Sequence, residues 1–229
     1  MNIKRHIPNA ITCLNLFSGC VAVWLAFNGD FAGALLAVLV AAVFDFCDGL
    51  AARLLKAYSA MGKELDSLAD VISFGFAPGA MIFSVLSTAQ APEILKFAGF
   101  IIPAFSALRL AKFNLDERQT SSFIGLPVPA NAIFWGGLVY AFAGFLAANW
   151  WFLLCLTLIS AFLLVCEIPM FSLKVKGLSY RDNKIQYIFI GGCLALLAIL
   201  RTKSVAFFIV WYVLFSIVLN LSKKKRHLK

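Results

Sequence analysis

Four aspartates stand close together in a part of the sequence that is otherwise apolar. They form two pairs, with spacings of three and four residues: Asp45 and Asp48, then Asp66 and Asp70. Residues at these spacings share one face of an α-helix. Carboxylate oxygens gathered on facing helices are the ligands that Mg²⁺ and Mn²⁺ prefer. The pattern predicts a site for Mg²⁺ or Mn²⁺, and two ions would neutralise its four negative charges.

The aspartates lie in segments that are long and apolar enough to cross a membrane. Of the 229 residues, 62% are hydrophobic and only 14% are charged, which is too little polar surface to cover a soluble globule. The apolar runs predict eight transmembrane helices, at 11–28, 31–55, 65–87, 93–113, 127–148, 150–170, 185–201 and 204–221. We therefore expect an all-α integral membrane protein, a helical bundle that forms a single domain over residues 1–229.

The basic residues predict the orientation of this bundle. With the N-terminus in the cytoplasm, all 20 Lys and Arg residues fall on the cytoplasmic side except Lys96, Arg201 and Lys203. Both termini and the aspartates' end of the bundle are therefore expected on the cytoplasmic side. The net charge of +9 is spread over short connecting segments, which favours topology signals and lipid headgroups over nucleic acid as its partner. The six cysteines show no metal-binding or disulfide spacing.

The aspartates need a partner because a single aspartate at the centre of a membrane helix costs roughly 2.5 to 3.5 kcal/mol. The connection between Arg53 and Gly62 is short, so the second and third helices should form an antiparallel hairpin that brings both pairs to one depth. On spacing alone, a metal-dependent enzyme and a cation transporter remain alternatives.

The residues between the aspartates carry a resemblance to a known family. The segment 45–70 reads Asp45-x-x-Asp48-Gly49-x-x-Ala52-Arg53, then eight residues, then Gly62-x-x-x-Asp66-x-x-x-Asp70. It resembles the signature of the CDP-alcohol phosphatidyltransferase family at every fixed position. The resemblance implies that all four aspartates bind metal around a CDP diphosphate and that Asp70 also serves as the general base. It also suggests a homodimer.

The same resemblance implies a set of residues that contact CDP-diacylglycerol, the donor of the phosphatidyl group. Gly49 and Ala52 leave room beside the aspartates, and the planar fork of Arg53 suits phosphate oxygens. Pro8-Asn9-x-x-Thr12 is similar to the start of the family's first helix. The expected CDP-diacylglycerol contacts are Asn9, Thr12, Gly49, Ala52, Arg53, Ser59 and Gly62. Helix packing, helix capping and membrane anchoring are the alternative roles for these residue types.

The acceptor is suggested by further segments, 66–79, 107–114, 125–130 and 168–174, which are similar to the phosphatidylserine synthase branch of the family. This implies transfer to L-serine in a prokaryotic cell (inner) membrane, with choline, inositol phosphate or glycerol phosphate as alternative acceptors. The candidate serine-binding residues are Arg109, Lys112, Asn114 and Lys174. Membrane anchoring is the alternative role for the Arg and Lys residues of this set. Glu167 either pairs with a nearby cation or contacts the ammonium group of serine.

Overall fold

The computed structural model describes residues 6–115, 123–170 and 184–227, and these are almost entirely helical. Two short strands, one π-helix and two 3-10 helices interrupt the described α-helices. The elements follow in this order: α1 (His6–Phe27), α2 (Phe31–Leu54), α3 (Ala60–Asp70), η2 (Val71–Phe76), α4 (Ala77–Thr88), η3 (Glu93–Phe100), α5 (Ile101–Leu115), β1 (Phe123–Ile124), α6 (Val128–Ala148), α7 (Trp150–Val165), β2 (Pro169–Met170), α8 (Lys184–Leu200), η4 (Arg201–Lys203) and α9 (Ser204–His227).

Five of the described helices are long and apolar enough to cross a membrane: His6–Phe27, Phe31–Leu54, Ala60–Thr88, Glu93–Leu115 and Val128–Ala148. Three shorter apolar helices follow, at Trp150–Val165, Ile185–Leu200 and Ser204–Asn220. The expected all-helical architecture is confirmed, and its apolar helices are those of an integral membrane protein.

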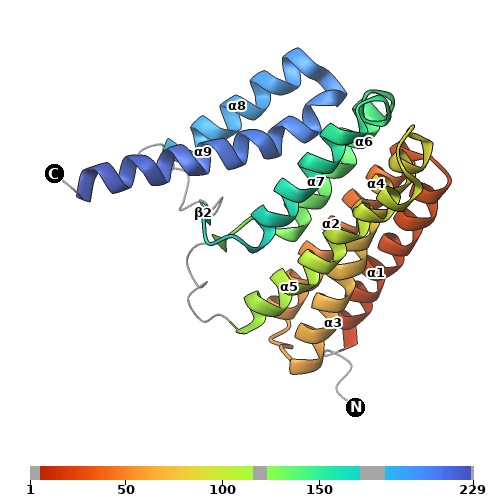
Figure 1. The fold of residues 1–229 in the computed structure, drawn as a ribbon. Coiled ribbons are helices and arrows are strands. Elements are labelled where there is room, and N and C mark those ends of the chain that lie inside the picture. The colour runs from red at the N-terminus through yellow and green to blue at the C-terminus, as the bar shows by residue number, and fades with distance from the viewer. Residues whose placement is uncertain (1–5, 116–122, 171–183, 228–229) are drawn as a thin grey trace.

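Helices α1 to α7 lie side by side in one bundle, and α8 and α9 form a hairpin at one side of it (Figure 1). The hairpin contacts the bundle mainly where α9 packs on α6. Large side chains such as Trp135, Phe74 and Met81 fill the centre of the bundle and are fully buried. Others, including Phe17 and Trp24, point outwards and are about two thirds exposed, as expected for a surface that lipid covers.

The third apolar segment is a continuous helix whose type changes along its length. It begins at Ala60, earlier than expected, because the Oγ of Ser59 caps it by accepting a hydrogen bond from the N–H of Gly62 at 3.0 Å. After Asp70 the chain forms the π-helix η2, in which the N–H of Ala77 donates to the carbonyl of Ile72. Pro78 follows directly, and in an α-helix its ring would crowd the carbonyl four residues earlier. The wider π-helical turn relieves this crowding and rotates α4 relative to α3.

Two glycines let α4 cross η3 at very short range. A Cβ atom on Gly99 would lie 2.5 Å from the carbonyl oxygen of Gly79 and 2.8 Å from the backbone nitrogen of Phe83. A Cβ atom on Gly79 would lie 2.9 Å from the carbonyl oxygen of Gly99. Backbone atoms cannot swing aside as side chains do, so this separation requires glycine on both helices. The crossing supports the long helix whose first part carries Asp66 and Asp70.

The sixth apolar helix is shorter than the expected span of 150–170. α7 ends at Val165, and Cys166 has an extended backbone with ψ 156°. The chain then pairs β2 with β1 in antiparallel register, with Phe123 opposite Met170 and Ile124 opposite Pro169. Gly125 makes this possible because it adopts φ +76°, and a Cβ atom there would lie 2.8 Å from the carbonyl oxygen of Cys166.

Candidate active site

A tight reversal of the chain places the end of α2 beside the start of α3. Lys56 adopts a left-handed backbone conformation with φ 50°, and the N–H of Ala57 donates to the carbonyl of Ala52 at 2.9 Å. The chain turns back within residues 55–59, and Ser59 then caps α3. The chain reverses as expected, and the two aspartate pairs lie at the same end of the bundle, but α2 and α3 pack on α1 rather than on each other.

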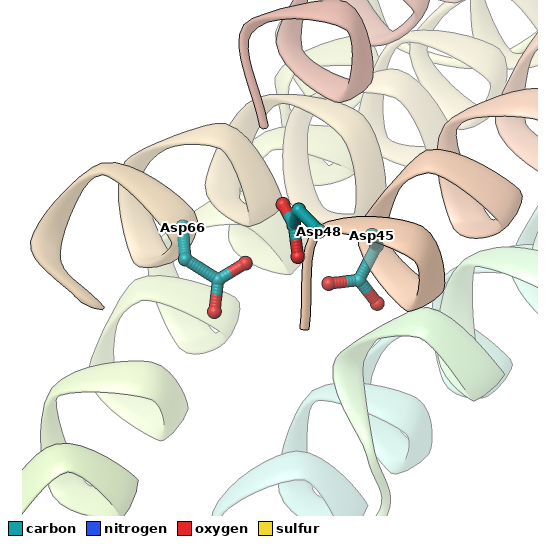
Figure 2. A group of neighbouring side chains, drawn as sticks. All are labelled: Asp45, Asp48 and Asp66. Atoms are coloured by element: carbon teal, nitrogen blue, oxygen red, sulfur yellow. The ribbon is translucent and has the colours of Figure 1, made fainter. Parts of the chain in front are cut away.

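Three of the four aspartates converge in the space between these helices. One carboxylate oxygen from each of Asp45, Asp48 and Asp66 lies within 4.8 Å of the other two. Figure 2 shows these carboxylates, the first two from α2 and the third from α3, directed towards one another. Asp48 is only 6% exposed, and the Oδ1 atom of Asp66 is buried without a hydrogen-bond partner among the described residues.

This arrangement fits a divalent cation. Two oxygens bound to one Mg²⁺ can lie up to about 4.2 Å apart, because each bond is about 2.1 Å long, so small side-chain movements would complete the coordination. Three buried or half-buried carboxylates without a nearby cation would repel one another strongly in these surroundings. The unpartnered oxygen of Asp66 is the clearest sign that this cluster is built to hold a positive ion.

Asp70 lies one helical turn beyond Asp66 and is not part of the group of three. Its side chain is nearly buried, with 7% exposed, and its Oδ1 accepts a hydrogen bond from the Nδ2 of Asn15 at 3.2 Å. Asn15 is itself fully buried, and its backbone carbonyl oxygen accepts a hydrogen bond from the hydroxyl of Ser73 at 3.0 Å. The fourth carboxylate is therefore held by α1 rather than by the other aspartates.

One face of α1 orients the acidic residues of the neighbouring helices. The Oγ1 of Thr12 donates to Oδ2 of Asp48 at 2.6 Å, and Asn15 holds Asp70 one turn further along. The sequence analysis selected Thr12 through its motif but missed Asn15. The signal was present, because Asn9, Thr12 and Asn15 follow one another at intervals of three residues and so share a helix face.

A cavity of about 560 Å³ opens beside the acidic cluster. It lies between the start of α1, the end of α2 and the start of α3. Its walls are formed by Pro8, Asn9, Thr12, Asp48, Gly49, Ala52, Ala57, Tyr58, Ser59, Ala60, Gly62, Lys63 and Asp66. Six of the seven residues expected to contact CDP-diacylglycerol are among these lining residues.

The two glycines of the cavity wall differ in their surroundings. A Cβ atom on Gly49 would meet nothing within 4 Å, so any side chain there would project into open space beside Asp48. A Cβ atom on Gly62 would lie 3.0 Å from Ser59 Oγ and 3.1 Å from Asn9 Oδ1. Gly49 thus keeps the cavity open, whereas Gly62 allows the start of α3 to pack closely on α1.

Arg53, the seventh expected donor contact, is exposed at the end of α2 and does not line the cavity. Tyr58 and Lys63 are among the lining residues that the sequence analysis did not select. Both lie in the signature segment, at positions where the signature specifies no residue type. The sequence offered only their positions as a sign that they line the cavity: Tyr58 lies in the chain reversal, and Lys63 directly follows Gly62.

The candidate acceptor residues gather at the end of α5. Arg109 is 4% exposed, and its guanidinium lies over the ring of Phe113 at 5.5 Å. Nζ of Lys112 forms a salt bridge of 3.1 Å with Glu167, so pairing with a nearby cation is confirmed for Glu167. Nδ2 of Asn114 donates to Oγ of Ser67 on α3 at 2.8 Å. Lys174 lies outside the described residues.

Comparison with known proteins places the chain in a family. A sequence model of the CDP-alcohol phosphatidyltransferases matches residues 5–165. The chain belongs to the CDP-alcohol phosphatidyltransferase family. The match runs from the N-terminal end of the chain to the end of α7, so α8 and α9 lie beyond it. It includes the whole CDP-alcohol phosphatidyltransferase signature, the acidic cluster and the cavity.

Several curated relatives within this family have names that specify a substrate. The CDP-diacylglycerol--serine O-phosphatidyltransferase of Mycobacterium leprae is 34% identical over 175 residues, which are 72% of this chain and 57% of that protein. The protein of the same name from Mycobacterium tuberculosis is 31% identical over 224 residues, 91% of this chain and 74% of the relative. The archaetidylserine synthase of Methanothermobacter thermautotrophicus is 36% identical over 129 residues, 56% of this chain and 54% of the relative.

Proposed function

We propose that this protein transfers the phosphatidyl group of CDP-diacylglycerol to L-serine, producing phosphatidylserine and CMP. The observation that carries the proposal is the acidic cluster of Asp45, Asp48 and Asp66 at the wall of a cavity lined by the family signature. The names of the curated relatives support serine as the acceptor.

The cavity is the proposed binding place of the donor. A CDP diphosphate there lies against the acidic cluster, with Gly49 and Ala52 leaving room for it. Asn9, Thr12, Ser59 and Gly62 also line the cavity. Arg53 is exposed at the cytoplasmic end of α2 and contacts the donor from outside the cavity. The acyl chains of the donor remain in the bilayer, alongside the apolar outer face of the bundle.

The proposed cofactor is Mg²⁺ or Mn²⁺, held by Asp45, Asp48 and Asp66, with Asp70 as the fourth ligand of a two-ion site. Bound divalent ions would polarise the phosphoryl oxygens and stabilise the charge that develops on departing CMP. Thr12 keeps the Asp48 carboxylate in a fixed orientation by donating a hydrogen bond to it. The chain's own contribution is therefore a preformed set of oxygen ligands.

Asp70 is the proposed general base. The serine hydroxyl oxygen forms a bond to the lipid-bearing phosphorus, and the bond from that phosphorus to the bridging oxygen breaks as CMP leaves. The hydroxyl proton passes to the carboxylate of Asp70, whose position Asn15 fixes. Because Asn15 donates to only one carboxylate oxygen, the other remains able to accept the proton.

Serine is held, in this proposal, by the residues at the end of α5. The nearly buried guanidinium of Arg109 suits a carboxylate, since a planar fork can bind both of its oxygens. Lys112, Asn114 and Lys174 complete the candidate set.

We further propose eight membrane spans, both termini in the cytoplasm, an active site on the cytoplasmic side, a single domain over residues 1–229 and a homodimer. The distribution of basic residues supports the orientation, since Lys96, Arg201 and Lys203 stand apart from the remaining Lys and Arg residues. The bacterial and archaeal relatives support a prokaryotic cell membrane.

An acceptor panel tests this function directly. Purified protein in mixed micelles receives CDP-diacylglycerol and Mn²⁺ together with L-serine, glycerol 3-phosphate, inositol phosphate or choline, and both CMP and the lipid product are measured. We expect CMP and phosphatidylserine in equal amounts with serine only, and no product after EDTA treatment. Product with glycerol 3-phosphate but not serine would reassign the acceptor. No CMP with any acceptor would favour the alternative of a cation transporter.

A further inference from the structure

Three side chains tie the signature helix α3 to the last turn of α5. The ammonium of Lys63 donates to the carbonyl oxygen of Asn114 at 3.0 Å, and the side-chain amide of Asn114 donates to the hydroxyl of Ser67 at 2.8 Å. The Ser67 hydroxyl in turn donates to the carbonyl of Lys63 at 3.3 Å. We call Lys63, Ser67 and Asn114 the α3–α5 clamp.

The clamp lies next to the chemistry on both of its helices. On α3, Ser67 directly follows Asp66 and precedes Asp70 by three residues, so a shift of Ser67 moves both carboxylates. On α5, Asn114 follows Arg109 by five residues and Lys112 by two. The first part of α5 packs on η2, which continues the helix beyond Asp70, whereas α3 itself has few contacts with α5. The clamp is therefore the hydrogen-bonded connection, among the described residues, between the acidic part of the helix and the last turn of α5.

Lys63 also belongs to the wall of the donor cavity. Its ammonium group reaches the carbonyl end of α5, where the helix dipole favours a positive charge. A ligand that fills the cavity touches the same side chain that holds α5. This gives the two substrate positions a direct physical link.

We propose that the α3–α5 clamp couples the donor cavity to the acceptor residues, so that the phosphatidyl group reaches serine rather than water. This inference rests on the proposed function. Through the clamp, Ser67 is a positioning residue, and Lys63 and Asn114 have a positioning role in addition to their proposed substrate contacts: together they hold α5 and Arg109 at a fixed place relative to Asp70. By linkage, a donor that strengthens the clamp raises the affinity for serine, and serine raises the affinity for the donor by the same factor.

Loss of the clamp has a defined chemical consequence. With α5 displaced, water takes the place of the serine hydroxyl, and its oxygen forms the bond to the lipid-bearing phosphorus. The bond to the bridging oxygen breaks as before, and one water proton passes to Asp70. The products are phosphatidic acid and CMP, so release of CMP exceeds formation of phosphatidylserine.

The test compares Ser67→Ala with Ser67→Thr, which keeps a hydroxyl, and Lys63→Met with Lys63→Arg, which keeps a cation. For Ser67→Ala we expect the KM for serine to rise about five- to tenfold, the effect of one lost half-buried hydrogen bond. For Lys63→Met, whose hydrogen bond is exposed, we expect a rise of about two- to threefold. For Ser67→Ala, the Kd for CDP-diacylglycerol measured without serine should not change, whereas its KM measured with serine should rise by the same factor as the KM for serine. For both variants the ratio of CMP to phosphatidylserine should rise above one. Both conservative variants should restore wild-type values.

A double-mutant cycle separates the clamp from a general loss of structure. If Asn114 acts through Ser67, adding Asn114→Ala to Ser67→Ala should raise the KM for serine less than it does in the wild type. The inference is overturned if the Ala and Met variants keep a CMP-to-phosphatidylserine ratio of one and an unchanged KM for serine, or lose only kcat. A wild-type protein that makes no phosphatidylserine would refute the proposed function itself, which is a separate outcome.

Discussion

Thr12 and Asn15 of α1 each hold one carboxylate of the neighbouring helices, and neither carries a charge. Their hydrogen bonds fix the orientation of Asp48 and Asp70 before any ligand arrives. A hydrogen bond from such a neighbouring residue determines how accurately a metal-binding or catalytic carboxylate is oriented. At the scale of single residues, two of the acidic side chains of the site are therefore oriented by hydrogen bonds from uncharged side chains.

The role of Asp70 is tested by Asp70→Asn. The amide oxygen of the new side chain can still accept the hydrogen bond from Asn15, so we expect the protein to fold and to keep its thermal unfolding midpoint. Turnover should fall by at least about 100-fold because the group that accepts the proton is lost. The measurement is CMP release at saturating serine. A variant that keeps most of its activity would exclude Asp70 as the base.

The support from Thr12 is tested by Thr12→Val, which removes the hydroxyl and keeps the shape. We expect the Mn²⁺ concentration for half-maximal activity to rise about tenfold, since Asp48 loses the donor that orients it. Thr12→Ser, which keeps the hydroxyl, is the matched control and should behave like the wild type. An equal Mn²⁺ requirement in all three proteins would contradict the assigned role.

At the scale of elements, the long third helix is held in place by close contacts with backbone. α4 crosses η3 where Gly79 and Gly99 meet, and η2 packs on α1 where a Cβ atom on Gly19 would lie 2.7 Å from Cα of Ser73. Both crossings leave no room for side chains. The position of α3, and with it of Asp66 and Asp70, therefore depends on glycines that lie outside the signature.

The variant Gly99→Ala tests the crossing of α4 and η3. Its new methyl group would meet backbone atoms of Gly79 and Phe83, so we expect the free energy of unfolding to fall by about 1 to 3 kcal/mol. Thermal unfolding in detergent measures this loss. Gly191→Ala is the control, because a Cβ atom there meets nothing within 4 Å and alanine favours the helix. Similar unfolding of both variants would show that the crossing adds no stability.

Helix periodicity explains which parts of the site could be predicted from sequence. Periodicity places Asp45 and Asp48 on one face of α2, and the short connection to α3 brings Asp66 to the same end, so these three residues converge as expected. The contact between Asn15 and Asp70 depends instead on how α1 is rotated against α3. That rotation is set by packing at Gly19 and by the π-helix before Pro78, and neither follows from a pattern of apolar residues.

At the scale of the whole molecule, the proposed orientation can be tested by labelling. In a chain whose six native cysteines are replaced, Lys56→Cys and Glu93→Cys each introduce one exposed reporter. We expect a membrane-impermeant maleimide to label the first only in inside-out vesicles and the second only in right-side-out vesicles, since the positively charged side faces the cytoplasm. Labelling of both reporters from the same side would refute the proposed topology.

The donor cavity and the three convergent carboxylates are built by residues 8–66 alone. Their helices α1, α2 and α3 are consecutive in the chain, so no long loop has to close before they meet. During synthesis these helices enter the bilayer before α4 to α9. We expect them to associate while the later helices are still being made, so that the acidic side chains find polar partners before hydrocarbon surrounds them.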